Sequence, residues 1–121
     1  MIRWKDGKRY CQILKHIKEH AEKILGWLVG VGKKDFWENE LLQAAVMREL
    51  EVIGEAAKGL SDAFKRKYPE VPWKEIAGMR DVLIHDYFEV DLEEVWTTAT
   101  EDVPELHRQI SRILSEPQPL L

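Results

Sequence analysis

"LLQAAVMRELEVIGEAAKGL", residues 41–60, places an apolar side chain at every third or fourth position. This spacing is that of one face of an amphipathic helix, and it lacks the alternation of a strand. We therefore predict a helix from about Asn39 to Leu60. Gly54 and Gly59 each cost this helix about 1 kcal/mol relative to alanine and can allow another helix to approach closely. The apolar stripe consists of Leu42, Ala45, Val46, Leu50, Ile53, Ala57 and Leu60.

The same period continues on both sides of this stretch. One helix is predicted from Gly7 to about Gly30, where glycines end it, and another from about Leu92 to Ser115. Between them, Asp35 followed by Glu38 resembles an N-cap for a short turn of helix. The segment 61–68, "SDAFKRKY", is predicted to be a further helix.

Prolines and a glycine mark helix starts, ends and a kink in the second half of the chain. Pro72 suits the first position of a short helix that ends at Ala77, because Gly78 then interrupts it. Asp91, with an acid three residues later, caps the last helix. Pro104 lies inside that helix, removes one backbone donor and should kink it.

These elements predict an all-α fold, a bundle of four to five helices with antiparallel neighbours. We expect a single domain over residues 1–115 and a short tail over residues 116–121. Cys11 is the sole cysteine, which excludes an internal disulfide and fits a reducing compartment. Without a signal-like N-terminus or an apolar run of the ~18 residues needed to span a bilayer, the chain is expected to be cytoplasmic and not bound to a membrane.

The net charge of −4 conceals an asymmetry along the chain. Residues 1–34 hold nine Lys or Arg and three Asp or Glu, a net charge of +6, so the remainder carries −10. Residues 86–105 contain eight acids and no Lys or Arg. A broad cationic surface for DNA or RNA is therefore not expected, and any contact with phosphate must be local or shared between chains.

The stretch "MRDVLIHDYF", residues 79–88, contains the candidate chemistry in an otherwise apolar run. On a straight helix Arg80 and His85 lie about 140° apart and about 7.5 Å apart along the axis, so they point in different directions. Asp81 shares a face with His85 and can orient it, and Tyr87 shares a face with Arg80. A late helix start at Gly78, or a second copy of the chain, would bring arginine and histidine together.

A two-fold dimer of this segment would place paired arginines and histidines in one cleft. Such a cleft has the groups needed to cleave RNA without a metal: a histidine as general base and a guanidinium to stabilise phosphoryl charge. A second interpretation is purely structural. In it, Arg80 pairs with a nearby acid and His85 is a satisfied, half-buried residue.

Other polar clusters give weaker signals. His16 and His20 are four apart, but the intervening residues do not match a metalloprotease motif and a third ligand is not evident, so no metal is expected. The basic run of Lys58, Lys65, Arg66 and Lys67 reads as a solvated helix face, which gains interest only if it folds next to Arg80.

"RDVLIHDY" has the R-x4-H-x-Y pattern of HEPN-domain toxins, and it specifically resembles the HepT-like family. The segments "LLQAAVMRELEVIGEAAKGLS", "PEVPWKEIAGMRDVLIHDYFEVD" and "VWTTATEDVPEL" resemble that family in the same order, so the likeness covers most of residues 35–110. The resemblance implies an up-and-down helical bundle that dimerises through the motif region. It also implies a ribonuclease toxin, without a cofactor, that is paired with a minimal nucleotidyltransferase antitoxin.

By that resemblance Arg80 and His85 are the catalytic pair and Asp81 is the supporting polar residue. Tyr87 is the residue on which the antitoxin installs AMP, which blocks the cleft with bulk and negative charge. Some members of the family are instead non-catalytic, nucleotide-binding or regulatory partners of the nucleotidyltransferase. The motif leaves both functions open.

Overall fold

The computed structural model describes residues 2–85 and 90–117, with side chains from residue 9 onward, and every regular element within them is helical. The all-α prediction is therefore confirmed. In chain order the elements are α1 (Ile2–Trp27), α2 (Lys33–Trp37), α3 (Glu40–Lys58), α4 (Asp62–Lys67), α5 (Trp73–His85), α6 (Leu92–Thr97), the π-helical turn η2 (Thr98–Asp102) and α7 (Val103–Ser115).

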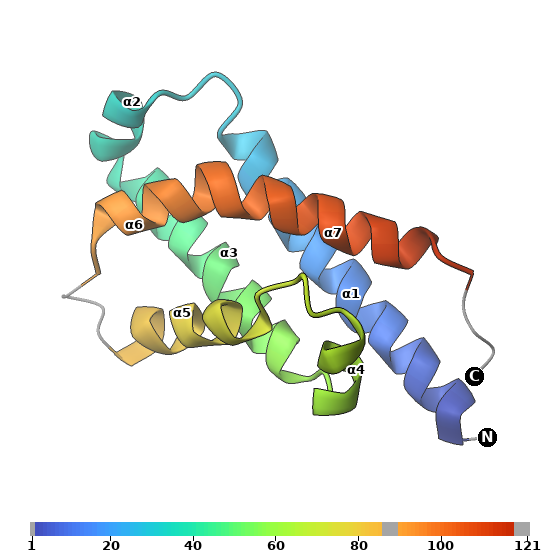
Figure 1. Cartoon of the computed structure of the whole chain (residues 1–121). Helices are drawn as coiled ribbons and strands as arrows, with labels where there is room; N and C mark the ends of the chain where they lie inside the picture. The colour runs from blue at the N-terminus through green and yellow to red at the C-terminus, as the bar shows by residue number, and fades with distance from the viewer. Residues whose placement is uncertain (1, 86–89, 118–121) are drawn as a thin grey trace.

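Helix α3 occupies the middle of the bundle, with α1 packed on one side and α5 on the other. Helices α1 and α3 run antiparallel, joined through α2, and the continuous α6–η2–α7 segment lies across them (Figure 1). Their apolar stripes meet in one core, as the periodicity predicts. Its most deeply buried large side chains are Phe36, Ile17, Ile24, Leu50, Ile53, Ile110 and Val46.

The predicted cap at Asp91 is confirmed at the start of α6, and other helices carry caps of the same kind. Asn39 caps α3 by accepting a hydrogen bond from the backbone of Leu42 (3.0 Å), and Ser61 caps α4 in the same way. Gly30, with φ of 73°, follows the end of α1 in the left-handed conformation that suits glycine. The prediction for Asp35 is wrong by one turn: Gly32 is the N-cap of α2, and Asp35 accepts from the Gly32 backbone (3.0 Å).

The predicted interruption at Gly78 is also wrong, because α5 runs unbroken from Trp73 to His85. Trp73, Ile76 and Leu83 are buried along one face of this helix. Their burial outweighs the cost of about 1 kcal/mol that a glycine imposes on a helix interior. As a result, the helix does not begin late at Gly78 and the motif residues keep ordinary helical spacing.

Pro104 disturbs the last helix through a widened turn. It stands in the first turn of α7, directly after the π-helical turn η2. A proline lacks the N–H that an α-helix would require there, and a π-bulge is one way to accommodate this loss. Thr100 Oγ1 also donates to the carbonyl of Trp96 (2.7 Å). The segment stays helical across the proline and continues over the core.

Candidate active site

Arg80 lies where α5 crosses α3 at very short range. A Cβ atom placed on Gly54 would come within 2.4 Å of the Arg80 Cβ and 2.9 Å of the Ile76 carbonyl oxygen. Only glycine permits this contact without displacement of a helix. The predicted close helix approach at Gly54 is thus confirmed, and it sets the position of Arg80 directly.

The Arg80 guanidinium is held by two carboxylates. Its Nη2 lies 3.2 Å from Glu55 Oε2 on α3, and its Nη1 donates to Asp81 Oδ1 at 3.0 Å. The side chain is 23% exposed, and its Nε is buried without a hydrogen-bond partner in the described part of the chain. The ion pairing that the structural interpretation predicts for Arg80 is therefore present.

Asp81 joins Arg80 to a second cation. Lys58 Nζ, from the end of α3, donates to Asp81 Oδ1 at 2.7 Å. The hydrogen bond from Lys58, followed by the one from Arg80, lowers the pKa of Asp81 below its ordinary value of 3.8. Lys58 therefore lies next to the motif. This meets, for Lys58, the condition under which the basic run becomes a candidate part of the site. Among the described residues, no hydrogen bond joins Asp81 to His85.

His85 is the last described residue of α5 and is exposed. Arg80 faces α3 while His85 faces solvent, as expected of two residues five apart on a continuous helix. The predicted divergence is confirmed, and the prediction of a half-buried histidine is wrong. Tyr87 lies outside the described residues. One copy of the chain consequently does not bring Arg80 and His85 to a common point.

A groove of about 330 Å³ lies beside Arg80 and is formed by α1, α3 and α5. Three basic side chains and two acidic ones line it, and His85 is not among them. The lining residues are His16, Arg48, Glu51, Val52, Glu55, Ala56, Arg80 and Ile84. The arginine of the motif is therefore accessible from a mixed-charge groove, although most of its surface is covered.

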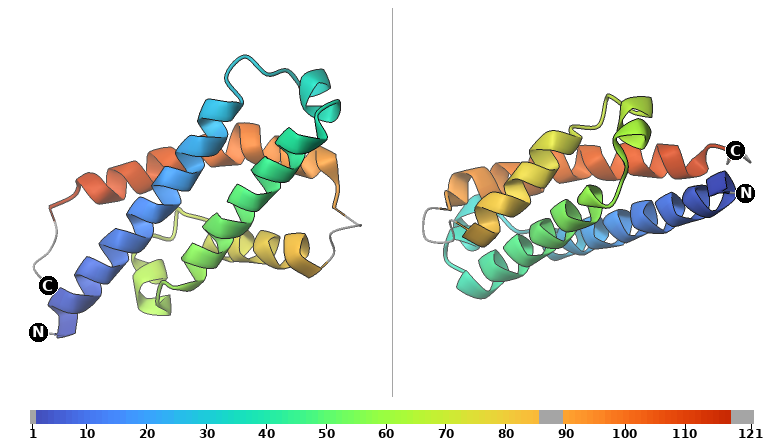
Figure 2. Two further views of the ribbon diagram at one scale, coloured as in Figure 1. Left: turned by 180° about the vertical axis from the view of Figure 1, so that it is seen from behind. Right: turned by 90° about the horizontal axis from the view of Figure 1, so that it is seen from below.

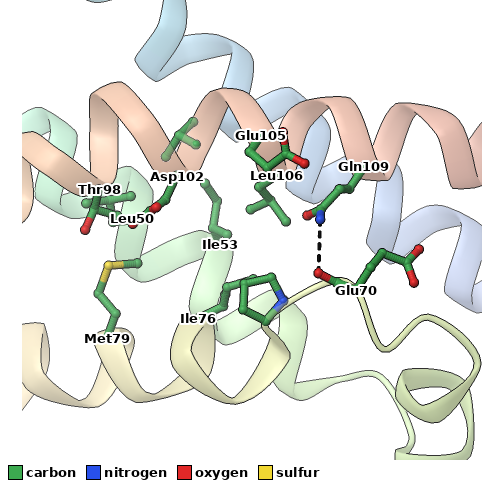
Figure 3. A pocket seen from close by; sticks show the side chains of 12 residues that line it. Leu50, Ile53, Glu70, Ile76, Met79, Thr98, Asp102, Glu105, Leu106 and Gln109 are labelled. Carbon is green, nitrogen blue, oxygen red and sulfur yellow. Dashed lines mark hydrogen bonds between the residues drawn. The ribbon is translucent and has the colours of Figure 1, made fainter.

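The opposite side of α5 faces a different cavity, between this helix and η2–α7 (Figure 3). This cavity measures about 250 Å³, and a neighbouring groove of about 530 Å³ shares part of its lining. The floor is apolar and the rim is acidic, without Lys or Arg in the lining of either. At one end, Gln109 Nε2 donates to the carbonyl of Glu70 (3.0 Å). The acids of the two linings are Glu70, Glu75, Glu93, Glu94, Asp102 and Glu105.

His16 and His20 do lie together, with ring centroids 4.3 Å apart in an edge-to-face arrangement. His20 Nδ1 is hydrogen-bonded to Glu49, which is only 8% exposed. Over residues 2–85 and 90–117, no group of three His, Cys, Asp or Glu side chains is placed to hold a metal ion. Within the same residues, no helix combines the length and apolarity required to cross a membrane.

Sequence reasoning did not identify Glu55 as part of this site. Glu55 follows Gly54, and Lys58 lies one turn after it, so the helix crossing at Gly54 brings both toward α5. Gly54 indicated in the sequence that another helix could cross α3 at this point. The helix that would cross there, and therefore the partner of Glu55, could be found only from the fold.

Comparison with known proteins gives one consistent family. The family model described as "Ribonuclease HepT-like" matches residues 17–113. "Putative RNase TTE0752" of Caldanaerobacter subterraneus is 44% identical over 103 residues, which make up 85% of this chain and 92% of the relative. "Probable ribonuclease HepT" of Thermococcus cleftensis is 43% identical over 100 residues, with 83% and 91% covered. No solved structure gives a significant match. The chain therefore belongs to the HepT-like ribonuclease family.

Proposed function

We propose that this protein is a metal-independent endoribonuclease that acts as a homodimer and is the toxin of a type VII-like toxin–antitoxin pair. Family membership and the ribonuclease names of the relatives support RNA as the substrate. The observation that carries the proposal is the placement of the motif on α5. Arg80 is fixed at a groove and His85 is exposed on the same unbroken helix, five residues on.

The proposed reaction is an internal transfer at phosphorus. His85 takes the proton of a ribose 2′-hydroxyl, and the 2′-oxygen attacks the adjacent phosphorus. Arg80 stabilises the added negative charge on the phosphoryl oxygens. The bond to the 5′-oxygen breaks, and a histidine from the second protomer supplies the proton that this oxygen needs. The products are a 2′,3′-cyclic phosphate and a 5′-hydroxyl.

The divergence of Arg80 and His85 supports a dimer. Within one chain α5 packs chiefly against α3, and Val82 and Ile84 keep 46% and 38% of their surface exposed near His85. Exposed apolar side chains beside a reactive histidine fit a self-complementary contact across a two-fold axis. In such a pair, each protomer's exposed histidine lies near the other protomer's motif.

RNA cleavage is the decisive measurement. Purified protein incubated with RNA in EDTA is expected to produce fragments with 2′,3′-cyclic phosphate ends, and His85→Ala should abolish them. His107→Ala is the matched control, because His107 pairs with Glu22 away from the motif (2.9 Å). Equal traces of cleavage from wild type and His85→Ala would show that the activity comes from a contaminant.

We further propose that a minimal nucleotidyltransferase antitoxin transfers AMP to Tyr87. The added phosphate would bring negative charge and bulk to the segment that follows His85. Incubation with such a partner and ATP should add the mass of AMP to the wild type and to Tyr68→Phe, but not to Tyr87→Phe. Modification of Tyr87→Phe to the wild-type extent would refute this assignment.

A second candidate function is a non-catalytic, nucleotide-binding or regulatory partner of the nucleotidyltransferase. The observation in its favour is that Glu55 and Asp81 already engage Arg80. This function predicts AMP transfer with no RNA cleavage by the unmodified dimer. The cleavage assay with the His85→Ala control separates the two functions.

A further inference from the structure

Most of the basic residues in the N-terminal third of the chain belong to α1, one of the helices that line the Arg80 groove. Arg9, His16 and Lys23 are spaced by seven residues, which puts them on one face of this helix, and all three are exposed. His16 itself lines the groove. Figure 2 shows α1 alongside α3, the helix that supplies most of the groove lining. Arg9 and Lys23 therefore place positive charge on the side of α1 that carries the groove residue His16.

Both arginines of the groove are paired with carboxylates from α3. Arg48 Nη1 lies 3.4 Å from Glu51 Oε1, and Arg80 Nη2 lies 3.2 Å from Glu55 Oε2. The Arg48 and Glu55 side chains are 69% and 56% exposed, so solvent reaches both pairs. Exposed ion pairs contribute little, at most about 1 kcal/mol, and an incoming anion can replace them.

His16 has a defined place in this groove. Its ring packs edge-to-face on His20, and His20 is in turn tied to the buried Glu49. The proposed cleavage reaction does not use any of these three residues. A buried carboxylate that anchors one histidine thereby supports the second histidine at the groove surface, where an imidazole N–H can donate to a phosphate oxygen.

We propose that this groove binds a backbone phosphate of the RNA strand, with His16 and Arg48 as contacts and Glu55 as the carboxylate that the phosphate displaces from Arg80. Phosphate and carboxylate oxygens both fit the planar fork of a guanidinium, so they compete for the same donors. This assignment rests on the proposed function, because it takes RNA as the ligand. The acidic, apolar grooves on the other side of α5 offer no comparable donors.

Binding can be measured without cleavage by using a short 2′-O-methyl RNA, which lacks the attacking hydroxyl. Fluorescence anisotropy at constant salt gives the dissociation constant for each full-length variant. Glu55→Gln should tighten binding about two- to fivefold, and Arg48→Gln should weaken it by a similar factor, the range expected for one exposed ion pair. His16→Gln should weaken binding in the same direction.

Matched controls remove the effect of net charge. Glu105 pairs with an exposed arginine on α7, and Arg112 pairs with Glu70 at 3.0 Å, both away from the groove. Glu105→Gln and Arg112→Gln change the charge by the same amounts. Their effects should be much smaller, because mobile salt screens charges beyond about 8 Å at physiological ionic strength. Circular dichroism confirms that each variant is folded.

The outcomes distinguish this subsite from the cleavage reaction. If Glu55→Gln and Glu105→Gln have equal effects, or if His16→Gln binds as the wild type does, the phosphate subsite is refuted while cleavage through His85 can stand. If the binding pattern appears but the wild type cuts no RNA, the subsite stands and the proposed catalysis is refuted.

Discussion

Gly54→Ala is the substitution that most directly tests how the site is built. The new methyl carbon would lie 2.4 Å from the Arg80 Cβ and 2.9 Å from the Ile76 carbonyl oxygen. Ordinary carbon contacts begin near 3.5 Å, so α5 must retreat from α3 by about 1 Å. Neither obstacle can rotate away, because one is a Cβ atom and the other belongs to the backbone.

The expected loss of stability follows from two opposing effects. Overpacking of this kind costs about 1–3 kcal/mol, while replacing a helical glycine with alanine returns about 1 kcal/mol. A contact of 2.4 Å with a Cβ atom that cannot rotate away belongs at the upper end of that cost, so we expect the free energy of unfolding to fall by about 2 kcal/mol in urea titrations. Gly78→Ala, in the interior of α5, is the matched control. Its added methyl group meets open space within the described residues, so it should raise stability by up to about 1 kcal/mol.

The same displacement should impair catalysis. A misplacement of about 1 Å can reduce the rate about 100-fold, so RNA cleavage by Gly54→Ala should fall far more than its folded fraction does. The comparison is made at a temperature at which circular dichroism shows both variants to be folded. If Gly54→Ala is as stable as the wild type, α5 does not approach α3 as closely as described and the argument for Arg80 fails.

Two further predictions concern the ion pairs. The pKa of Asp81 is lowered by Lys58 and Arg80, so its contribution to stability is present above its unfolded-state pKa and is lost as the pH falls through the lower folded-state pKa. Asp81→Asn should reduce the steepness of acid unfolding below pH 3.8, and an unchanged profile would contradict this. Glu49→Ala leaves the half-buried His20 without its hydrogen-bond partner and should cost about 1–3 kcal/mol in urea titrations. Glu105→Ala, at an exposed pair, should cost less than about 1 kcal/mol, and equal losses would refute the distinction.

Helical periodicity predicted the core well because it reports burial directly. Along α3 the residues of the predicted stripe include Val46, Leu50, Ile53 and Ala57, and all four are buried. An apolar residue every third or fourth position can be covered only on one helical face, whichever neighbour covers it. For this reason the fold class could be inferred without knowledge of how the helices cross.

Local signals were less reliable where burial opposed them. Gly78 has low helix propensity, but the buried neighbours Ile76 and Leu83 belong to one continuous face of α5. An aspartate can accept a backbone N–H either from the N-cap position or from the third position of a helix, as Asp35 does from Gly32, so its sequence position did not fix the start of α2. Propensity and capping preferences are worth about 1 kcal/mol each, and tertiary packing can outweigh them.

The pairing of Arg80 illustrates the limit of reasoning from one segment. Its spacing from His85 was sufficient to predict that the two residues diverge. Its partner Glu55 lies on another helix, and that contact depends on the crossing of α3 and α5 at Gly54. Sequence spacing determines the directions in which side chains point around one helix, but it does not show which other helix packs against that face.

The order of charges around Arg80 explains why an RNA phosphate would displace Glu55 and leave Asp81 in place. Lys58, Asp81, Arg80 and Glu55 alternate in sign along a chain of contacts at 2.7, 3.0 and 3.2 Å. Asp81 is held by two cations, so removing it would leave both without their partner. Glu55 stands at the end of the chain, with Arg80 as its only ion-pair partner among the described residues and 56% of its side chain exposed. An incoming phosphate can therefore take the place of Glu55 while Asp81 and Lys58 keep the guanidinium oriented.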